Sequence, residues 1–254
     1  MTITLLPDIA FAFMLIFARL GSMIMLMPAV GDRAVPVRIR LVFALAMTLV
    51  FYPLIQPTLP AVPQNLPAMA TVFGSELIVG LFIGIAIRMI LVALTVAGTT
   101  IAFQMGLGFA NGIDPTQEGG QGAVIGTFLS LLGLTLILAT DLHHVFIAAL
   151  GDSYRMIPAG TLFSAGDMAR TAMMMFADAF RLGIQMSAPF IAFGLLFYLG
   201  LGILSRLMPQ LQVFFIAMPL NITLGFIMLA ILIVSLMGWY LDHVGQAIAP
   251  FVAG

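Results

Sequence analysis

The segment 77-LIVGLFIGIAIRMILVALTVAGTTIAF-103 contains 27 residues, of which a single one, Arg88, is charged. An apolar run longer than about 18 residues is typical of a helix that crosses a bilayer. Over all 254 residues, 62% are hydrophobic and 7% are charged, and so few charges would not cover the surface of a soluble protein. We therefore predict an all-α, polytopic membrane protein built from about six long, kinked helices.

Six membrane segments result when the apolar runs are divided at prolines, glycines and clusters of charge. They cover residues 8–27, 37–55, 68–105, 123–150, 168–204 and 211–249. The third, fifth and sixth are longer than a hydrocarbon layer of about 30 Å requires at about 1.5 Å per residue. We therefore expect these three to tilt, to kink or to extend beyond the membrane.

The arginines predict the orientation. Arg33, Arg38 and Arg40 lie between the first two segments, and Arg206 lies between the last two. Since loops rich in Lys and Arg remain in the cytoplasm, we expect both of these turns to be cytoplasmic and both chain ends to lie outside.

The composition excludes several functions. All nine basic residues are arginines and they form no basic patch, so we expect no nucleic-acid partner. The sequence has no cysteine, no GxSxG or HExxH motif and no P-loop lysine. The one tight cluster of titratable groups is Asp141, His143 and His144, and the two histidines should point away from each other on a helix. We expect no enzymatic activity, no catalytic residue, no cofactor and no metal.

Arg19, Glu76 and Arg88 are three of the charged residues that lie inside the apolar segments. Arg19 and Arg88 each cost a few kcal/mol at such positions unless they face protein or water. Either they serve as pore or assembly contacts, or they bind backbone carbonyls or an acid on a neighbouring helix. Glu76 lies about 18 Å along one helix from Arg88, so these two residues need partners elsewhere. On the same segment, Gly80 and Gly84 form a small-xxx-small pattern that lets a neighbouring helix come close.

The glycine-rich segment 106–126 is the least helical part of the chain. It holds seven of the 25 glycines, together with Asn111-Gly112 and Asp114-Pro115, a composition typical of turns. Broken helices around such a segment also occur in small-molecule transporters, although no inverted repeat is evident. From the residues alone, a channel, a transporter and an assembly subunit remain open.

The stretch 104-QMGLGFANGIDP-115 resembles the FliR family, a flagellar export-gate subunit whose injectisome counterpart is SctT. The resemblance runs from about Leu6 to Leu241, and Gln212 departs from it because the family pattern has asparagine there. Further residues match in the family's order: Arg19, Pro28, Pro36, Arg40, Glu76, Gly80, Gly84, Asp141 to His144, Ser153, Tyr154, Pro158 and Ser205 to Gln210.

The resemblance implies a pore subunit for the export of unfolded flagellar proteins across the bacterial inner membrane, in the flagellar basal body. It implies one copy per gate, assembled with FliP and FliQ and lying near FlhB and FlhA. Residues 1–165 would form a FliP-like part and residues 166–254 a FliQ-like helical hairpin. The alternatives are an injectisome subunit of the SctT type and, from a different class, a small-molecule transporter.

The resemblance also implies two sites. A plug would close the pore with the loop over residues 106–122, and an ordinary surface loop is the alternative. The cytoplasmic turn near FlhB would contain Arg206, Pro209 and Gln210. The plug residues expected from the resemblance are Gly106, Gly108, Phe109, Asn111, Gly112, Ile113, Asp114 and Pro115.

Overall fold

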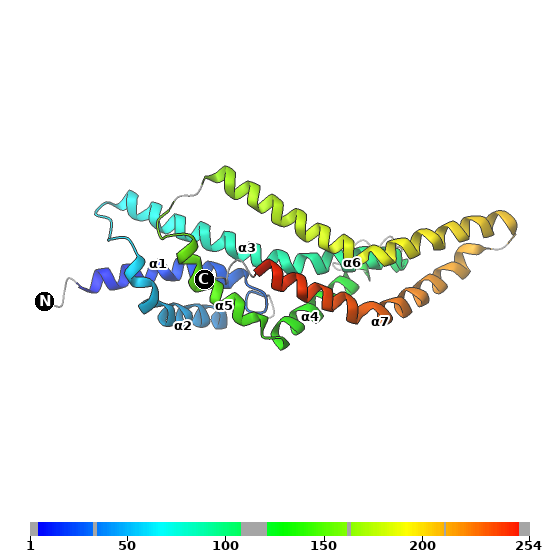
Figure 1. Ribbon diagram of the computed structural model, residues 1–254, viewed down its shortest axis with the longest axis horizontal. Helices are drawn as coiled ribbons and strands as arrows, with labels where there is room; N and C mark the ends of the chain where they lie inside the picture. Colours follow the sequence, from blue (N-terminus) through cyan, green and yellow to red (C-terminus); the bar gives the residue numbers. More distant parts are fainter. Residues whose placement is uncertain (1–4, 33–34, 108–120, 162–163, 211, 249–254) are drawn as a thin grey trace. The chain divides into compact units, whose positions relative to one another are not determined.

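The computed structural model describes the chain except for residues 1–4, 33–34, 108–120, 162–163, 211 and 249–254 (Figure 1). In the part it describes, the regular elements are all helices, so the prediction of an all-α protein is confirmed. The elements in chain order are α1 (Leu5–Leu26), α2 (Val37–Ile55), the short 3₁₀ helix η1 (Gln56–Thr58), α3 (Leu66–Gln104), α4 (Gln121–Ala139), α5 (Leu142–Met156), α6 (Ala165–Leu207) and α7 (Val213–Ile248).

Five of the described helices, α1, α2, α3, α6 and α7, are long and apolar enough to cross a membrane. The sequence predicts a further continuous segment over residues 123–150, but the structure divides it into α4 and α5, which are bent by 78°. Asp141 lies at the bend with a φ of 58°, a left-handed conformation that an α-helix does not continue through and that aspartate tolerates. If the bent pair forms one broken span, the described residues contain six.

Three helices exceed the thickness of the bilayer, as the sequence predicts. The helices α3, α6 and α7 contain 39, 43 and 36 residues, which correspond to about 58, 64 and 54 Å of helix. Pro189 lies inside α6 and Pro219 inside α7, where each removes a backbone hydrogen bond and permits a kink.

The chain forms two compact units. Unit 1 comprises residues 1–89, 137–176 and 245–254, and unit 2 comprises residues 90–136 and 177–244. Fully buried side chains of α1, among them Leu15, Leu20 and Met23, lie in the core of unit 1. Phe190 of α6 and Tyr240 of α7 are likewise fully buried in unit 2. These units follow packing rather than chain order, so the division at residue 165 stays a prediction.

Two glycines of α3 allow a close approach of α1 in unit 1. An ideal Cβ on Gly80 would overlap the hydroxyl of Ser22 and the carbonyl oxygen of Arg19. An ideal Cβ on Gly84 would lie 2.9 Å from Cβ of Leu26. The small-xxx-small pattern on α3 therefore packs against the backbone of α1, which is the role such patterns have in membrane helices.

We predict that Gly80→Ala destabilises the protein by about 1–3 kcal/mol, since the added methyl group meets backbone atoms that must move. The measurement is the thermal unfolding midpoint of the chain in detergent. The matched control is Gly74→Ala on the same helix, where nothing lies within 4 Å of the added atom; there the midpoint should stay or rise. Equal midpoints for the two variants would contradict the close approach.

Candidate functional site

A buried ion pair joins α1 to α3 in unit 1. Arg19 Nε lies 2.6 Å from Glu76 Oε2, and Arg19 Nη2 donates a hydrogen bond of 2.9 Å to Glu76 Oε1. Both residues are fully buried. The two parallel bonds match the planar guanidinium to the carboxylate, which is the strongest geometry available to such a pair.

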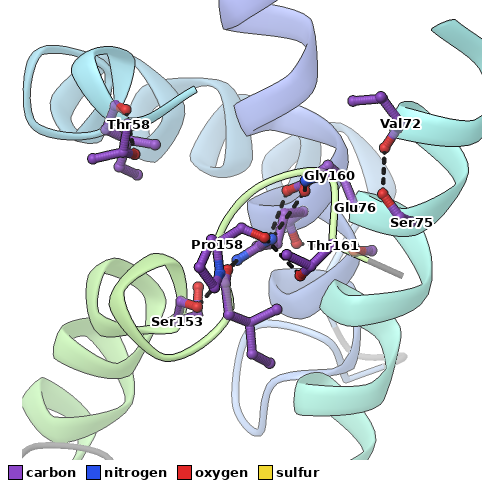
Figure 2. A network of polar contacts seen from close by, with 12 residues as sticks. Thr58, Val72, Ser75, Glu76, Ser153, Pro158, Gly160 and Thr161 are labelled. Atoms are coloured by element: carbon purple, nitrogen blue, oxygen red, sulfur yellow. Dashed lines mark hydrogen bonds and ion pairs between the residues drawn. The ribbon is translucent and has the colours of Figure 1, made fainter. Parts of the chain in front are cut away.

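The remaining polar atoms of the pair bind the end of α5 and the loop that follows it. Arg19 Nη1 donates to the carbonyl oxygens of Ser153, at 3.1 Å, and Ile157, at 2.8 Å. The backbone N–H of Gly160 donates to Glu76 Oε1 at 2.9 Å. Figure 2 shows how the loop through Gly160 brings its backbone to Glu76. Gly160 has a φ of 77°, which glycine adopts without steric cost.

Tyr154 lies against the guanidinium of Arg19. The Cζ atom of Arg19 is 4.0 Å from the centre of the tyrosine ring, and Tyr154 is 5% exposed. A desolvated cation over an aromatic face adds about 2 kcal/mol of attraction. Three helices therefore build this site. The helices α1 and α3 supply the charges, and the end of α5 supplies an aromatic face and two carbonyls.

This network shows which groups bind Arg19 and Glu76, a question that the sequence left open. Arg19 has both an acid on a neighbouring helix and backbone carbonyls as partners. Arg88, in contrast, is exposed, and within the described residues it makes no hydrogen bond or ion pair. A role for any of the three in assembly stays a prediction.

A second polar contact holds the end of α3 in unit 2. Asn221 of α7 is 3% exposed, and its Nδ2 donates a hydrogen bond of 3.0 Å to the carbonyl oxygen of Gln104. That carbonyl is one of the last of α3 and has no partner within its own helix. Gly106 follows with a φ of 81°, the left-handed conformation that commonly ends a helix. An ideal Cβ on Gly106 would lie 3.1 Å from Asn221 Nδ2.

Glycines of two other helices leave room for the side chains of Gln104, the last residue of α3, and of Met105, which follows it. An ideal Cβ on Gly194 of α6 would overlap the side-chain oxygen of Gln104, and one on Gly225 of α7 would lie 3.0 Å from Cβ of Met105. The QMG sequence at residues 104–106 therefore packs closely against both α6 and α7. Sequence reasoning missed Asn221, although an amide two residues after Pro219 in an apolar helix is a signal for it.

The other predicted site residues divide into two groups. Arg206 lies at the end of α6, and Arg206, Pro209 and Gln210 are all exposed. Of the predicted plug residues, Gly106 belongs to the described part of the chain. The others lie outside the described residues: Gly108, Phe109, Asn111, Gly112, Ile113, Asp114 and Pro115.

The cluster of Asp141, His143 and His144 differs from the expectation. The two imidazole rings do not point apart, because their centroids lie 4.1 Å from each other. The bend at Asp141 places both histidines in the first turn of α5, next to a backbone that has left the helix. The three side chains offer ligand atoms within 4.8 Å of one another. Asp141 and His144 are exposed, which weakens any site made from them.

We predict that Glu76→Gln destabilises the chain by about 3–5 kcal/mol, because it leaves the charge of Arg19 buried and uncompensated. The measurement is the thermal unfolding midpoint in detergent. The double variant Arg19→Met with Glu76→Met removes both charges and should recover most of the lost midpoint. A double variant as unstable as Glu76→Gln would show that packing, and not charge pairing, determines the effect.

Comparisons with known proteins give a consistent result across both units. The family described as bacterial export proteins, family 1, matches residues 10–247. The flagellar biosynthetic protein FliR of Caulobacter vibrioides is 46% identical over 217 residues, which cover 85% of this chain and 86% of that protein. FliR of Bacillus subtilis is 35% identical over 88% of this chain and 86% of its own length. FliR of Escherichia coli is 30% identical over 92% of this chain and 88% of its own length.

Proposed function

Because the chain belongs to the FliR family of bacterial flagellar export proteins, we propose that it is the subunit that forms the flagellar type III export gate together with FliP and FliQ. Unfolded flagellar proteins cross the inner membrane through this pore, in the flagellar basal body. The observation that carries the proposal is the family match over residues 10–247. The relatives named above are flagellar proteins, which favours the flagellar system over an injectisome.

The length and apolarity of the helices support a place in a larger assembly. The most apolar window of α6 is 17% buried, and that of α2 is also 17% buried. Helices of about 54–64 Å are longer than one bilayer is thick. Lipid therefore cannot cover all of their apolar surface, and other protein subunits must cover the rest. In this proposal one copy of the chain joins several copies of FliP and FliQ, with FlhB and FlhA at the cytoplasmic side. Arg206, Pro209 and Gln210 lie at the turn that faces FlhB.

The proposal assigns roles to the two parts of the chain. Residues 1–165 form the FliP-like part, and residues 166–254 form the FliQ-like hairpin of α6 and α7. The protein acts without catalysis, as a wall of the pore, and other components supply the energy for export.

The segment over residues 106–122 is the plug of the closed pore in this proposal. Phe109 and Ile113 seal the lumen by apolar contact, while Asn111 and Asp114 are solvated when the pore opens. Two described features support a defined starting point for this segment. Gly106 ends α3 in a left-handed conformation, and Asn221 holds the preceding carbonyl.

We predict that deletion of the gene abolishes swimming and flagellar protein secretion, and that a plasmid copy restores both. An affinity-tagged copy should purify as one chain with several copies of two other small membrane proteins, measured by native mass spectrometry. A stable homodimer without other subunits, in cells that still swim, would reject the proposed function.

We predict that deleting residues 108–120 makes cells with the assembled gate leak ions and small solutes, because the lumen loses its seal. The measurement is the uptake of a small fluorescent dye by cells that express the variant. The control is the intact gate at the same expression level, verified by purification of both complexes. Normal assembly with unchanged permeability would reject the segment as a seal.

A further inference from the structure

The bend between α4 and α5 brings together three side chains that can bind a metal ion. Asp141 lies at the bend, and His143 and His144 lie in the first turn of α5. One potential ligand atom of each residue lies within 4.8 Å of the other two. All three residues belong to unit 1, while the hydrogen bonds of the buried Arg19 in that unit go to other residues. The cluster therefore has a role separate from that network.

The two histidines lie on the same side of the first turn of α5. A regular helix rotates neighbouring residues by about 100°, which is why the sequence predicts that His143 and His144 point apart. In the structure the centroids of the two imidazole rings are 4.1 Å apart, and the ring planes are inclined by 34°. The reason for expecting no metal at this cluster is therefore absent.

The carboxylate of Asp141 is available to the histidines. Asp141 is the N-cap residue of α5, a position at which an aspartate side chain usually accepts a hydrogen bond from an N–H of the first turn. Here the side chain makes no such capping bond. Its Oδ1 instead lies 3.7 Å from Nδ1 of His144. The carboxylate can thus serve as a ligand without leaving a backbone partner.

A ring nitrogen of His143 needs a partner. Within the part of the chain that the structure describes, Nδ1 of His143 is buried and has no hydrogen-bond partner. A buried polar atom without a partner costs free energy, and native structures leave few of them. A metal ion bound at this nitrogen would supply the partner.

The ring of His144 is oriented by the backbone. Its Nδ1 lies 3.3 Å from the carbonyl oxygen of Asp141. When Nδ1 carries the proton, it donates to this carbonyl, and the lone pair of Nε2 is free for a metal ion. A backbone carbonyl that fixes the tautomer in this way is common for histidines that bind metals.

The ligand types favour zinc. Two imidazoles and one carboxylate suit Zn²⁺, whereas Mg²⁺ and Ca²⁺ prefer oxygen ligands throughout. Tetrahedral bonds of about 2.0–2.1 Å hold neighbouring ligand atoms about 3.3 Å apart, so the three side chains need to close by at most about 1.5 Å. The side chains of Asp141 and His144 are 78% and 68% exposed and are free to turn. Their exposure lowers the affinity but gives a hydrated ion direct access.

We propose that Asp141, His143 and His144 form a zinc site, with three protein ligands and a water molecule at the fourth position. The bound ion would link the residue at the bend to the first turn of α5 and so stabilise the 78° angle between α4 and α5. This ion-binding activity goes beyond the export-gate function and does not depend on it.

Zinc titration of the full chain in detergent tests the site. The chain carries an affinity tag without histidine, is treated with a chelator, and is then titrated with Zn²⁺ in competition with a fluorescent zinc indicator. We expect about one ion per chain. The affinity should fall at least about tenfold in His143→Gln, His144→Gln and Asp141→Asn. Asparagine tolerates the left-handed conformation, so Asp141→Asn tests the carboxylate and leaves the bend in place.

The matched control is His243→Gln, which changes the remaining histidine of the chain, on α7. This variant should bind zinc as tightly as the unaltered chain. An unaltered chain that binds no zinc overturns the proposal, and so does an affinity that the three ligand substitutions leave unchanged.

Chemical protection tests the site in the unaltered chain and does not depend on how a variant folds. Diethyl pyrocarbonate modifies unprotonated imidazole nitrogens, and mass spectrometry measures the modification of each histidine. At a Zn²⁺ concentration of about ten times Kd, the rate at His144 should fall about tenfold, because only the free site reacts. The rate at His243 should not change, and Mg²⁺ at the same concentration should protect neither residue. Equal rates at His144 with and without Zn²⁺, or equal protection by Mg²⁺, would overturn the proposal.

Discussion

A charge inside an apolar medium must have a partner, and in unit 1 this constraint is met by the bidentate pair of Arg19 and Glu76. The pair is fully buried, and three backbone groups form hydrogen bonds to it. Arg19 requires the carbonyls at the end of α5, and Glu76 requires the N–H of Gly160. The helices α1 and α3 pack closely at Gly80, and this close packing allows the two charged side chains to meet. The packing and the ion pair therefore depend on each other.

The same constraint operates on the backbone in unit 2. The last carbonyls of a helix have no internal partner, and inside an apolar assembly water does not replace one. Asn221 binds the carbonyl of Gln104, while Gly194 and Gly225 leave room for the side chains at the end of α3. The start of the glycine-rich segment is therefore a defined position, held by helices far away in the sequence.

Polar groups that the chain satisfies itself differ from those that it leaves open. Arg19, Glu76 and Asn221 have partners within the chain, whereas Arg88, Asp178 and Arg181 are exposed and unpaired among the described residues. The first group stabilises the fold of a single subunit. The second group, together with the exposed apolar surface of α6, is what other subunits would cover in the proposed assembly. In that assembly the 62% hydrophobic composition would reflect protein contacts as well as lipid.

The sequence by itself determined the fold class, the approximate ends of the membrane segments, the excess length of α3, α6 and α7, and the family. Each of these depends on the length of an apolar run or on a contiguous motif, which are local properties of the chain. Only the tertiary structure decided that Arg19 pairs with Glu76, that the carbonyl of Gln104 binds Asn221 and that the fourth segment bends at Asp141. The first two join residues 57 and 117 positions apart. The bend is a single backbone conformation within an otherwise helical composition, and hydrophobic periodicity carries no information about it.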